Sequence, residues 1–276
     1  MDFILPAVLS LGLISIISAI VLYIVSKKFE VREDPRIAEI QAILPAANCG
    51  GCGYPGCSGF AAACVAASSL DGLLCPVGGA ATMTRLAGIL GKTVERSDPR
   101  IAVLHCNGRC EKRPRLNRYD GLSVCAAASL LYGGETGCSY GCLGMGDCVA
   151  VCNFNAIRIH PETLLPEIDE ARCTACGACA KACPKQLIRM LKKGPDSHRV
   201  YVACMNKEKG AVARKACAAA CIACSKCVKI CVSQAITLEN NLARIDEEKC
   251  ILCGQCVAEC PTSAIVEHIK NKIESC

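Results

Sequence analysis

Large aromatic side chains are scarce in this chain, which has no tryptophan, four phenylalanines and six tyrosines among 276 residues. A large apolar core is difficult to build from such a composition, and small units of this kind need covalent or metal staples. The scarcity also leaves no set of stacking rings between the basic residues, so we expect no nucleic-acid partner. The formal charge of +6 does not alter this, because metal clusters held by thiolates would bring the total below zero.

Two other features are missing. No basic stretch precedes the apolar N-terminal run and no small-residue cleavage site follows it, which disfavours a secreted disulfide scaffold. Gly51, Gly53 and Gly56 match the GxGxxG pattern, but no apolar strand precedes them, so we reject a dinucleotide site. The four histidines have no ligand spacing.

Cysteine, in contrast, is abundant, with 27 residues, and part of its spacing is duplicated. Five cysteines recur later at one constant offset: Cys125, Cys138, Cys142, Cys148 and Cys152 are matched by Cys204, Cys217, Cys221, Cys227 and Cys231. Each copy is followed by a further quartet, and the offset between these quartets is slightly smaller. Such self-similarity indicates a duplicated folding unit, here defined more by metal ligands than by an apolar core.

An uncharged run extends from Phe3 to Val25. As a helix it would be about 34 Å long, which is enough to cross a bilayer. Tyr23 near its end and the following Lys27 and Lys28 are typical of an interfacial aromatic and a cytoplasmic positive flank. We expect residues 1–26 to form a single-pass anchor in the cytoplasmic (inner) membrane, with the lipid bilayer as a partner and the cysteine-rich part on the cytoplasmic side. A buried core helix or an uncleaved signal is the alternative.

The segment 27–95 contains PAANCGGCGYPGC, then an alanine-rich stretch and LLCP. Glycines permit tight turns that direct backbone amides toward the sulfur atoms of an anionic cluster. We expect a small domain with one [4Fe–4S] cluster held by Cys49, Cys52, Cys57 and Cys75. A zinc site is the alternative, since zinc also takes four thiolates. Cys64 lies within the helical stretch, where we expect a buried small side chain.

Two runs, beginning at Cys173 and Cys250, match the CxxCxxCxxxCP pattern of bacterial ferredoxins, in which the fourth cysteine binds the neighbouring cluster. Their partner runs are less regular, because Met145 replaces one cysteine while Asn153 and Val232 replace the prolines. We therefore predict ferredoxin-like 2[4Fe–4S] modules at 138–200 and 201–276, after a connecting segment at 96–137. The first module would use Cys138, Cys142, Cys148 and Cys183 for one cluster and Cys152, Cys173, Cys176 and Cys179 for the other. The second would use Cys221, Cys224, Cys227 and Cys260, then Cys231, Cys250, Cys253 and Cys256.

For some cysteines the sequence does not decide whether they bind a cluster. Cys217 aligns with Cys138, so either Cys217 or Cys224 is the ligand, and the regular spacing favours Cys224. Cys106, Cys110, Cys125 and Cys204 match no common motif and are either structural thiols or ligands of a sixth cluster. About five [4Fe–4S] clusters are expected, with a sixth possible. The basic stretch from Arg109 to Arg118 is either a solvated loop or a docking site for an acidic electron carrier.

The apolar anchor, the CGGCGYPGC loop with Cys75 and the paired cysteine runs together resemble the B subunit of the Rnf ion-translocating electron-transport complex. The resemblance implies an α+β, cluster-organised relay that exchanges electrons with soluble ferredoxin and with the other membrane and flavin-bearing subunits. It also implies an electron-transfer subunit with no self-contained active site. The rival interpretations are a membrane-tethered polyferredoxin serving a hydrogenase or a redox sensor, and a zinc-bound scaffold.

Overall fold

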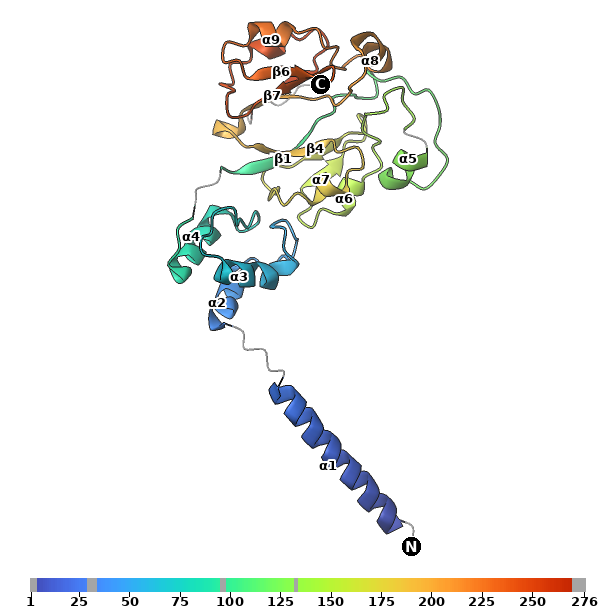
Figure 1. Cartoon of the computed structure of the whole chain (residues 1–276). Coiled ribbons are helices and arrows are strands. Elements are labelled where there is room, and N and C mark those ends of the chain that lie inside the picture. The colour runs from blue at the N-terminus through green and yellow to red at the C-terminus, as the bar shows by residue number, and fades with distance from the viewer. Residues whose placement is uncertain (1–3, 29–33, 95–97, 132–133, 270–276) are drawn as a thin grey trace.

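The computed structural model describes residues 4–28, 34–94, 98–131 and 134–269 of the chain. The end of the second expected module, residues 270–276, lies outside this range. Helix α1 (Ile4–Lys28) stands apart from the rest of the chain (Figure 1). Its apolar side chains from Leu11 onward are exposed, and Leu11–Lys28 is long and apolar enough to cross a membrane. No other described helix passes that test of length and composition.

Three helices form the next unit: α2 (Pro35–Ile43), α3 (Gly56–Ala66) and α4 (Gly79–Leu90). Its core contains the fully buried side chains of Ile40, Phe60 and Leu86, and the rings of Phe60 and Tyr54 meet edge to face at 5.7 Å. The Nζ atom of Lys92 donates to the carbonyl oxygens of Cys64 at 2.7 Å and Val65 at 3.0 Å, which satisfies the C-terminal end of α3. A small apolar core is therefore present around the CGGC loop.

The remaining chain contains two repeats of one β-α-β-β-α-β path, drawn from green to red in Figure 1. The first repeat (residues 100–192) consists of β1 (Arg100–Leu104), α6 (Asp147–Ala150), β2 (Ile157–Ile159), β3 (Pro166–Ile168), α7 (Ala178–Ala182) and β4 (Ile188–Lys192). The second repeat (residues 199–268) consists of β5 (Arg199–Val202), α9 (Lys226–Ile230), β6 (Ile236–Glu239), β7 (Leu242–Ile245), α10 (Gln255–Ala258) and β8 (Ile265–His268). Additional elements are α5 (Cys125–Leu131), a 3-10 turn (Pro195–Ser197) and α8 (Gly210–Ala216).

Each repeat pairs its outer strands and its inner strands separately. The antiparallel pairs are β1 with β4 and β2 with β3 in the first repeat, and β5 with β8 and β6 with β7 in the second. Strand β1 lies within residues 96–137, for which the cysteine spacing predicts a connecting segment, so the first repeat begins before its first paired run. The cysteines of the paired runs lie on the four short helices and on the loops that flank them.

Charged side chains hold the repeats together. Arg199 on β5 donates to Glu170 of the first repeat at 2.5 Å, and Nε2 of His268 lies 2.7 Å from the same carboxylate. Glu170 is mostly covered, with 18% of its side chain exposed. Burial alone would raise the pKa of Glu170, but the hydrogen bonds from Arg199 and Ser197 outweigh it and lower that pKa.

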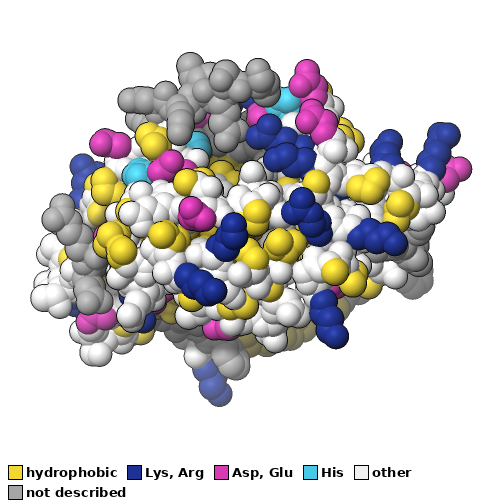
Figure 2. Space-filling model, turned by 90° about the horizontal axis from the view of Figure 1, so that it is seen from above, with side chains coloured by type: hydrophobic (Ala, Val, Ile, Leu, Met, Phe, Trp, Pro, Cys, Tyr) yellow, Lys and Arg dark blue, Asp and Glu magenta, His cyan; other side chains and the backbone are white. Residues whose placement is uncertain are grey.

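Figure 2 views the molecule from the end that carries the second repeat. On this face, Lys and Arg side chains are spread between apolar side chains.

Candidate metal centres

The first predicted ligand set converges in the three-helix unit. One cavity is lined by Cys49, Cys52, Cys57 and Cys75 together with Phe60. The loop is shaped by Gly53 and Gly56, whose φ values of 87° and 80° favour glycine. The side-chain oxygen of Asn48 accepts from the Cys57 amide at 2.8 Å, and the Gly78 amide lies 3.3 Å from Cys75 Sγ. Amide donors therefore already point at a thiol in this cavity.

Cys64 is fully buried in the same unit and is absent from the lining of that cavity. Burial raises the pKa of its thiol to about 11. The expectation of a buried side chain at this position is confirmed.

A second cavity brings together the four thiols predicted for one site of the first repeat, namely Cys152, Cys173, Cys176 and Cys179. The Ala156 amide lies 3.4 Å from Cys152 Sγ. Burial raises the pKa of Cys179 to about 12, and the neighbouring thiolates of Cys173 and Cys176 add to the rise. Four clustered thiolates are thus unfavourable by themselves, and a bound cationic iron core would remove that cost.

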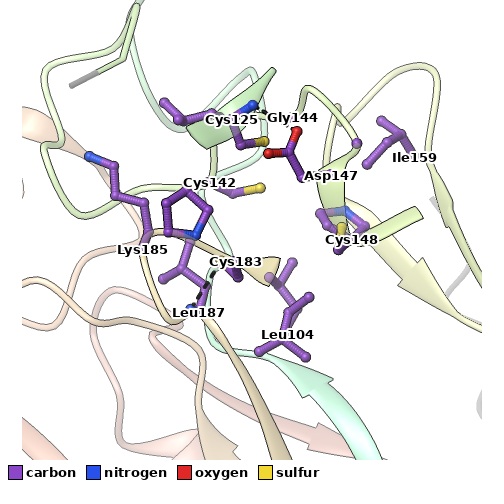
Figure 3. Close-up of a pocket in the computed structure, with 15 residues that line it drawn as sticks. Leu104, Cys125, Cys142, Gly144, Asp147, Cys148, Ile159, Cys183, Lys185 and Leu187 are labelled. Atoms are coloured by element: carbon purple, nitrogen blue, oxygen red, sulfur yellow. Dashed lines mark hydrogen bonds between the residues drawn. The ribbon is translucent and has the colours of Figure 1, made fainter. Parts of the chain in front are cut away.

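The third site differs from the sequence prediction in one member. Its cavity is lined by Cys142, Cys148 and Cys183, and by Cys125 (Figure 3). Cys138, the predicted fourth ligand, is not among the residues that line it. Figure 3 shows Cys125 and Cys142 facing the same space beside Asp147, with the Leu187 amide bonded to Cys183 Sγ at 3.4 Å.

The local structure explains why Cys125 lies there. Helix α5 begins at Cys125, and the carboxylate of Asp147 accepts from the amides of Cys125 at 2.7 Å and Ala126 at 3.0 Å. The backbone amide of Met145 in turn donates toward the Cys125 thiol and lowers its pKa against the larger effect of burial, which raises it. The Cys125 thiol therefore lies beside the backbone of Met145, the residue that stands where the second repeat has Cys224. The missing cysteine was the only sequence signal for this, because a long stretch of chain separates Cys125 from Cys142.

In the second repeat, two groups of the predicted thiols interact electrostatically. The Cys227 thiol interacts electrostatically with Cys221, Cys224 and Cys260. Cys256 does so with Cys250, Cys253 and Cys227, so its site adjoins the first. The amides of Ala235 and Ala264 each lie 3.3 Å from a thiol, that of Cys231 and that of Cys260.

Whether Cys217 or Cys224 is the ligand can be judged from the thiols that lie near each of them. Cys224 interacts with Cys227, whereas the Cys217 thiol interacts with Cys138 and Cys106. The structure thus groups Cys217 with Cys106, which the sequence left open, and with Cys138, which was predicted for the first module. The basic stretch is partly internal, since Arg113 is only 6% exposed and its Nη1 donates to the Cys142 carbonyl.

These thiol sets have the donor chemistry of iron–sulfur clusters. Within the described residues, no three His, Cys, Asp or Glu side chains are close enough to hold one metal ion. A cubane spreads its four thiolates wider than one ion does, and it is stabilised by amides directed at sulfur, which Cys75, Cys152, Cys183, Cys231 and Cys260 all receive. The donor sets therefore fit [4Fe–4S] clusters.

Comparisons with known proteins agree with this chemistry. A family model described as a 4Fe-4S dicluster domain matches residues 137–187 and 220–264, and a model described as a putative Fe-S cluster matches residues 44–76. The B subunit of the Na(+)-translocating ferredoxin:NAD(+) oxidoreductase complex of Acetobacterium woodii is 47% identical over 240 residues, which are 87% of this chain and 70% of the relative. The B subunit of the proton-translocating complex of Clostridium ljungdahlii is 39% identical over 85% of this chain and 81% of the relative. The B subunit of an ion-translocating oxidoreductase complex of Methanosarcina acetivorans is 37% identical over 83% and 85%.

Proposed function

The chain belongs to the B subunits of ion-translocating ferredoxin:NAD(+) oxidoreductase complexes, and on that premise we propose that it relays single electrons between soluble ferredoxin and the other subunits. It is an iron–sulfur electron-transfer subunit of an oxidoreductase and translocase complex, and no residue is needed as acid, base or nucleophile. The relatives' names include both sodium- and proton-translocating complexes.

The observation that supports this proposal best is that neighbouring thiol sets lie close to one another. A Cβ atom added to Gly51, in the CGGC loop, would lie only 2.7 Å from the Cys176 carbonyl oxygen. The Cys179 thiol interacts with Cys148 of the next site, and Cys256 interacts with Cys227 in the second repeat. The thiols of the N-terminal unit and of each repeat thus form series of adjacent sites.

We assign about five [4Fe–4S] clusters to these sites, in one single-cluster domain and two tandem ferredoxin-like modules. When bound, the clusters accept and release single electrons at potentials set by burial, charge and hydrogen bonds to sulfur. The chain's residues supply those three controls. Thiolates hold the iron, the amides of Gly78, Ala156, Leu187, Ala235 and Ala264 are directed at sulfur, and apolar side chains such as Ile157 and Ile188 exclude water.

The exposed end of the second repeat has features of a docking face for an acidic carrier such as ferredoxin. Residues 207–231 contain six basic side chains and one acidic one. Lys226 and Lys229 are exposed on α9, and the Cys224 thiol beside them is also exposed. Figure 2 views this end, where blue basic side chains lie among apolar ones. Complementary charge would accelerate encounter and make it depend on ionic strength.

Helix α1 anchors the chain at the membrane in this proposal. It has 25 residues, and Lys27 and Lys28 lie in its last turn. Because positive residues flank membrane helices on the cytoplasmic side, the cysteine-rich part faces the cytoplasm, where thiols stay reduced. The partners there are soluble ferredoxin and the membrane and flavin-bearing subunits of the complex.

Inverted membrane vesicles test the proposal directly. Ferredoxin-dependent NAD reduction and ion uptake are measured in vesicles from cells lacking this chain, and again after the full chain is restored. Both rates should fall to background without the chain and return with it. A matched variant, Lys226→Glu with Lys229→Glu, should retain its iron, slow electron entry from ferredoxin and show a weaker salt dependence. Unchanged rates without the chain would overturn the assignment.

A further inference from the structure

Because Cys125 and not Cys138 lines the third cavity, Cys138 belongs to none of the sites above. Four other cysteines near the boundary of the repeats are also unassigned: Cys106, Cys110, Cys204 and Cys217. Three of these, Cys138, Cys204 and Cys217, are buried, at 7%, 9% and 6% exposure. Cys110 is exposed, and its thiol lies 3.5 Å from the Thr163 carbonyl oxygen. We therefore consider Cys106, Cys138, Cys204 and Cys217 together and leave the exposed Cys110 out of the group.

The four cysteines of this set occupy equivalent places in the two repeats. Cys106 follows β1 by two residues, and Cys204 follows β5 by two residues. Cys138 precedes Cys142 by four residues, and Cys217 precedes Cys221 by four. Each repeat thus contributes one thiol after its first strand and one before its first cysteine run. The constant offset had aligned Cys204 with Cys125 instead, because the first repeat has a longer segment, which includes α5, between its first strand and its first run.

The four thiols also meet in space. A Cβ atom on Gly108 would lie 3.5 Å from both Cys106 Sγ and Cys217 Sγ. Asn206, which is fully buried, places its Nδ2 atom 3.6 Å from Cys138 Sγ and its backbone amide 3.4 Å from Cys204 Sγ. The thiol charges interact in the pairs Cys138 with Cys106, Cys217 with both of these, and Cys204 with Cys138.

The strand ends that carry these thiols are fixed to each other. The Asn107 amide donates to the Ala203 carbonyl at 2.9 Å, and the Ala218 amide donates to the Lys112 carbonyl at 2.7 Å. The buried guanidinium of Arg113 acts on the thiols of Cys142 and Cys217. Four thiols, one amide side chain, two amide donors and a cation therefore converge at the boundary, with Cys204 receiving amide bonds like the thiols of the other sites.

We propose that Cys106, Cys138, Cys204 and Cys217 hold a sixth [4Fe–4S] cluster at the boundary between the repeats, and that Cys125 replaces Cys138 at the third site. The set fits a cubane because two pairs of thiols approach from opposite repeats and amide hydrogens point at their sulfurs. Arg113 and Asn206 offset the negative charge that such a cluster adds.

The position gives this cluster a role, which rests on the proposed function. Cys106 interacts with Cys142 of the third site, and the Cys221 amide of the second repeat lies 3.3 Å from Cys204 Sγ. The sixth site therefore joins the series of the first repeat to that of the second. One electron arrives from the neighbouring cluster on one side and one leaves to the cluster on the other. No proton moves and no covalent bond is made or broken in this exchange.

Iron analysis of the full chain, purified without oxygen and fully reconstituted, tests the ligands independently of ferredoxin. About 24 irons per chain are expected for six [4Fe–4S] clusters, against about 20 for five. Cys217→Ser should lose about four irons, and Cys110→Ser, the matched control, should lose none. A content of about 20 irons in the unchanged chain, or an unaltered content in Cys217→Ser, would overturn the proposal.

Double substitutions separate the two assignments of Cys138. If Cys138 and Cys217 share a cluster, Cys138→Ser with Cys217→Ser should lose about four irons, no more than either change alone. Cys138→Ser with Cys125→Ser should lose about eight, because two different clusters are affected. The reverse pattern would overturn the proposal. The electron paramagnetic resonance of the remaining clusters reports folding, since a misfolded variant would lose all signals together.

Discussion

The first and second repeats follow the same chain path, but they complete their first cysteine run differently. The second repeat has Cys224 within the run, between Cys221 and Cys227. The first repeat has Met145 there, and Cys125 from α5 lies against the Met145 amide instead. In the ligand set that we propose, a thiol from outside the run takes the role of the missing cysteine.

The same comparison extends to the residue beside each run. Asp147 of the first repeat corresponds to Lys226 of the second. Asp147 bonds the first two amides of α5 and so fixes Cys125, whereas Lys226 is exposed on α9. The two repeats therefore differ both in the residue that would complete the run and in the side chain beside it.

The largest expected effect comes from removing Cys125 and then giving the first run the cysteine that the second run has. Cys125→Ser should remove one cluster, about four irons, because the third site keeps only three thiols. Adding Met145→Cys to that variant should restore the iron, since it recreates the run of the second repeat. Iron and acid-labile sulfide content of the purified chain decides the matter. Full iron content in Cys125→Ser would show that Cys138, not Cys125, completes the site.

A second difference between the repeats concerns what covers the second cysteine of each quartet. Cys176 is in contact with the N-terminal unit at Gly51, whereas its counterpart Cys253 is exposed. Gly51→Val would force the two loops apart, since even a Cβ atom would lie 2.7 Å from the Cys176 oxygen. We expect electron transfer between the unit and the first repeat to slow about tenfold, which corresponds to about 1.4 kcal/mol.

Rapid-freeze spectroscopy of stepwise cluster reduction would measure that rate. Gly88→Ala is the matched control, because a Cβ atom there meets nothing within 4 Å and alanine is a better helix former. An unchanged transfer rate in Gly51→Val, with full iron content, would show that electrons do not pass through this contact.

Much of this arrangement was accessible from the sequence, for reasons that the particular residues make clear. The sets around Cys75 and Cys179 were predicted from local spacing, and the structure brings both together, because a short loop constrains three ligands at once. For the site containing Cys142, the spacing of the first run predicts Cys138 as the fourth ligand, whereas Cys125 lines the cavity. Contacts made through Asp147 and α5 depend on tertiary packing that a cysteine spacing does not encode.

Among the strand pairs, too, local features follow from the sequence and long-range pairings do not. The inner strands β2 and β6 lie in AIRIH and AITLE, where apolar and polar residues alternate locally as is typical of short strands. The outer pair β1 with β4 joins residues far apart in the chain, and β1 lies within a segment that the spacing of the cysteines assigned to a connection. Pairing at such separation leaves no local pattern, so Cys106 could not be related to Cys204 before the fold was known.

A smaller effect is expected from weakening the fixation of Cys125. Asp147→Asn keeps one hydrogen-bond acceptor at the start of α5 but removes the charge, and Asp147→Ala removes both. Loss of such a cap costs about 1 kcal/mol, so the third site should lose iron to chelators sooner in the alanine variant than in the asparagine variant. Lys226→Ala in the second repeat is the matched control and should leave chelation rates unchanged. Equal rates in all variants would contradict the positioning role of Asp147.

The smallest expected effect is on stability, when the equivalent acidic residues of the two repeats, Glu170 and Glu247, are replaced in turn. Glu170 is partly buried against Arg199 and His268, whereas Glu247 is exposed and accepts from the Lys192 amide at 2.7 Å. Glu170→Gln should therefore destabilise the chain by about 1–2 kcal/mol, after allowance for solvent screening, and Glu247→Gln by less.

Urea unfolding of the cluster-loaded chain, followed by loss of cluster absorbance, would compare the two variants at neutral pH. The expected order follows from the pKa of Glu170, which is lowered in the folded chain, so its stabilisation is present above its ordinary pKa and is lost as the pH falls through the folded value. The difference between Glu170→Gln and the unchanged chain should therefore persist in mild acid and shrink only below the ordinary carboxyl pKa of 4.5. A difference that persists below that pKa, or one equal for both glutamates, would mean that the repeats are held by packing and clusters and not by the Glu170 ion pair.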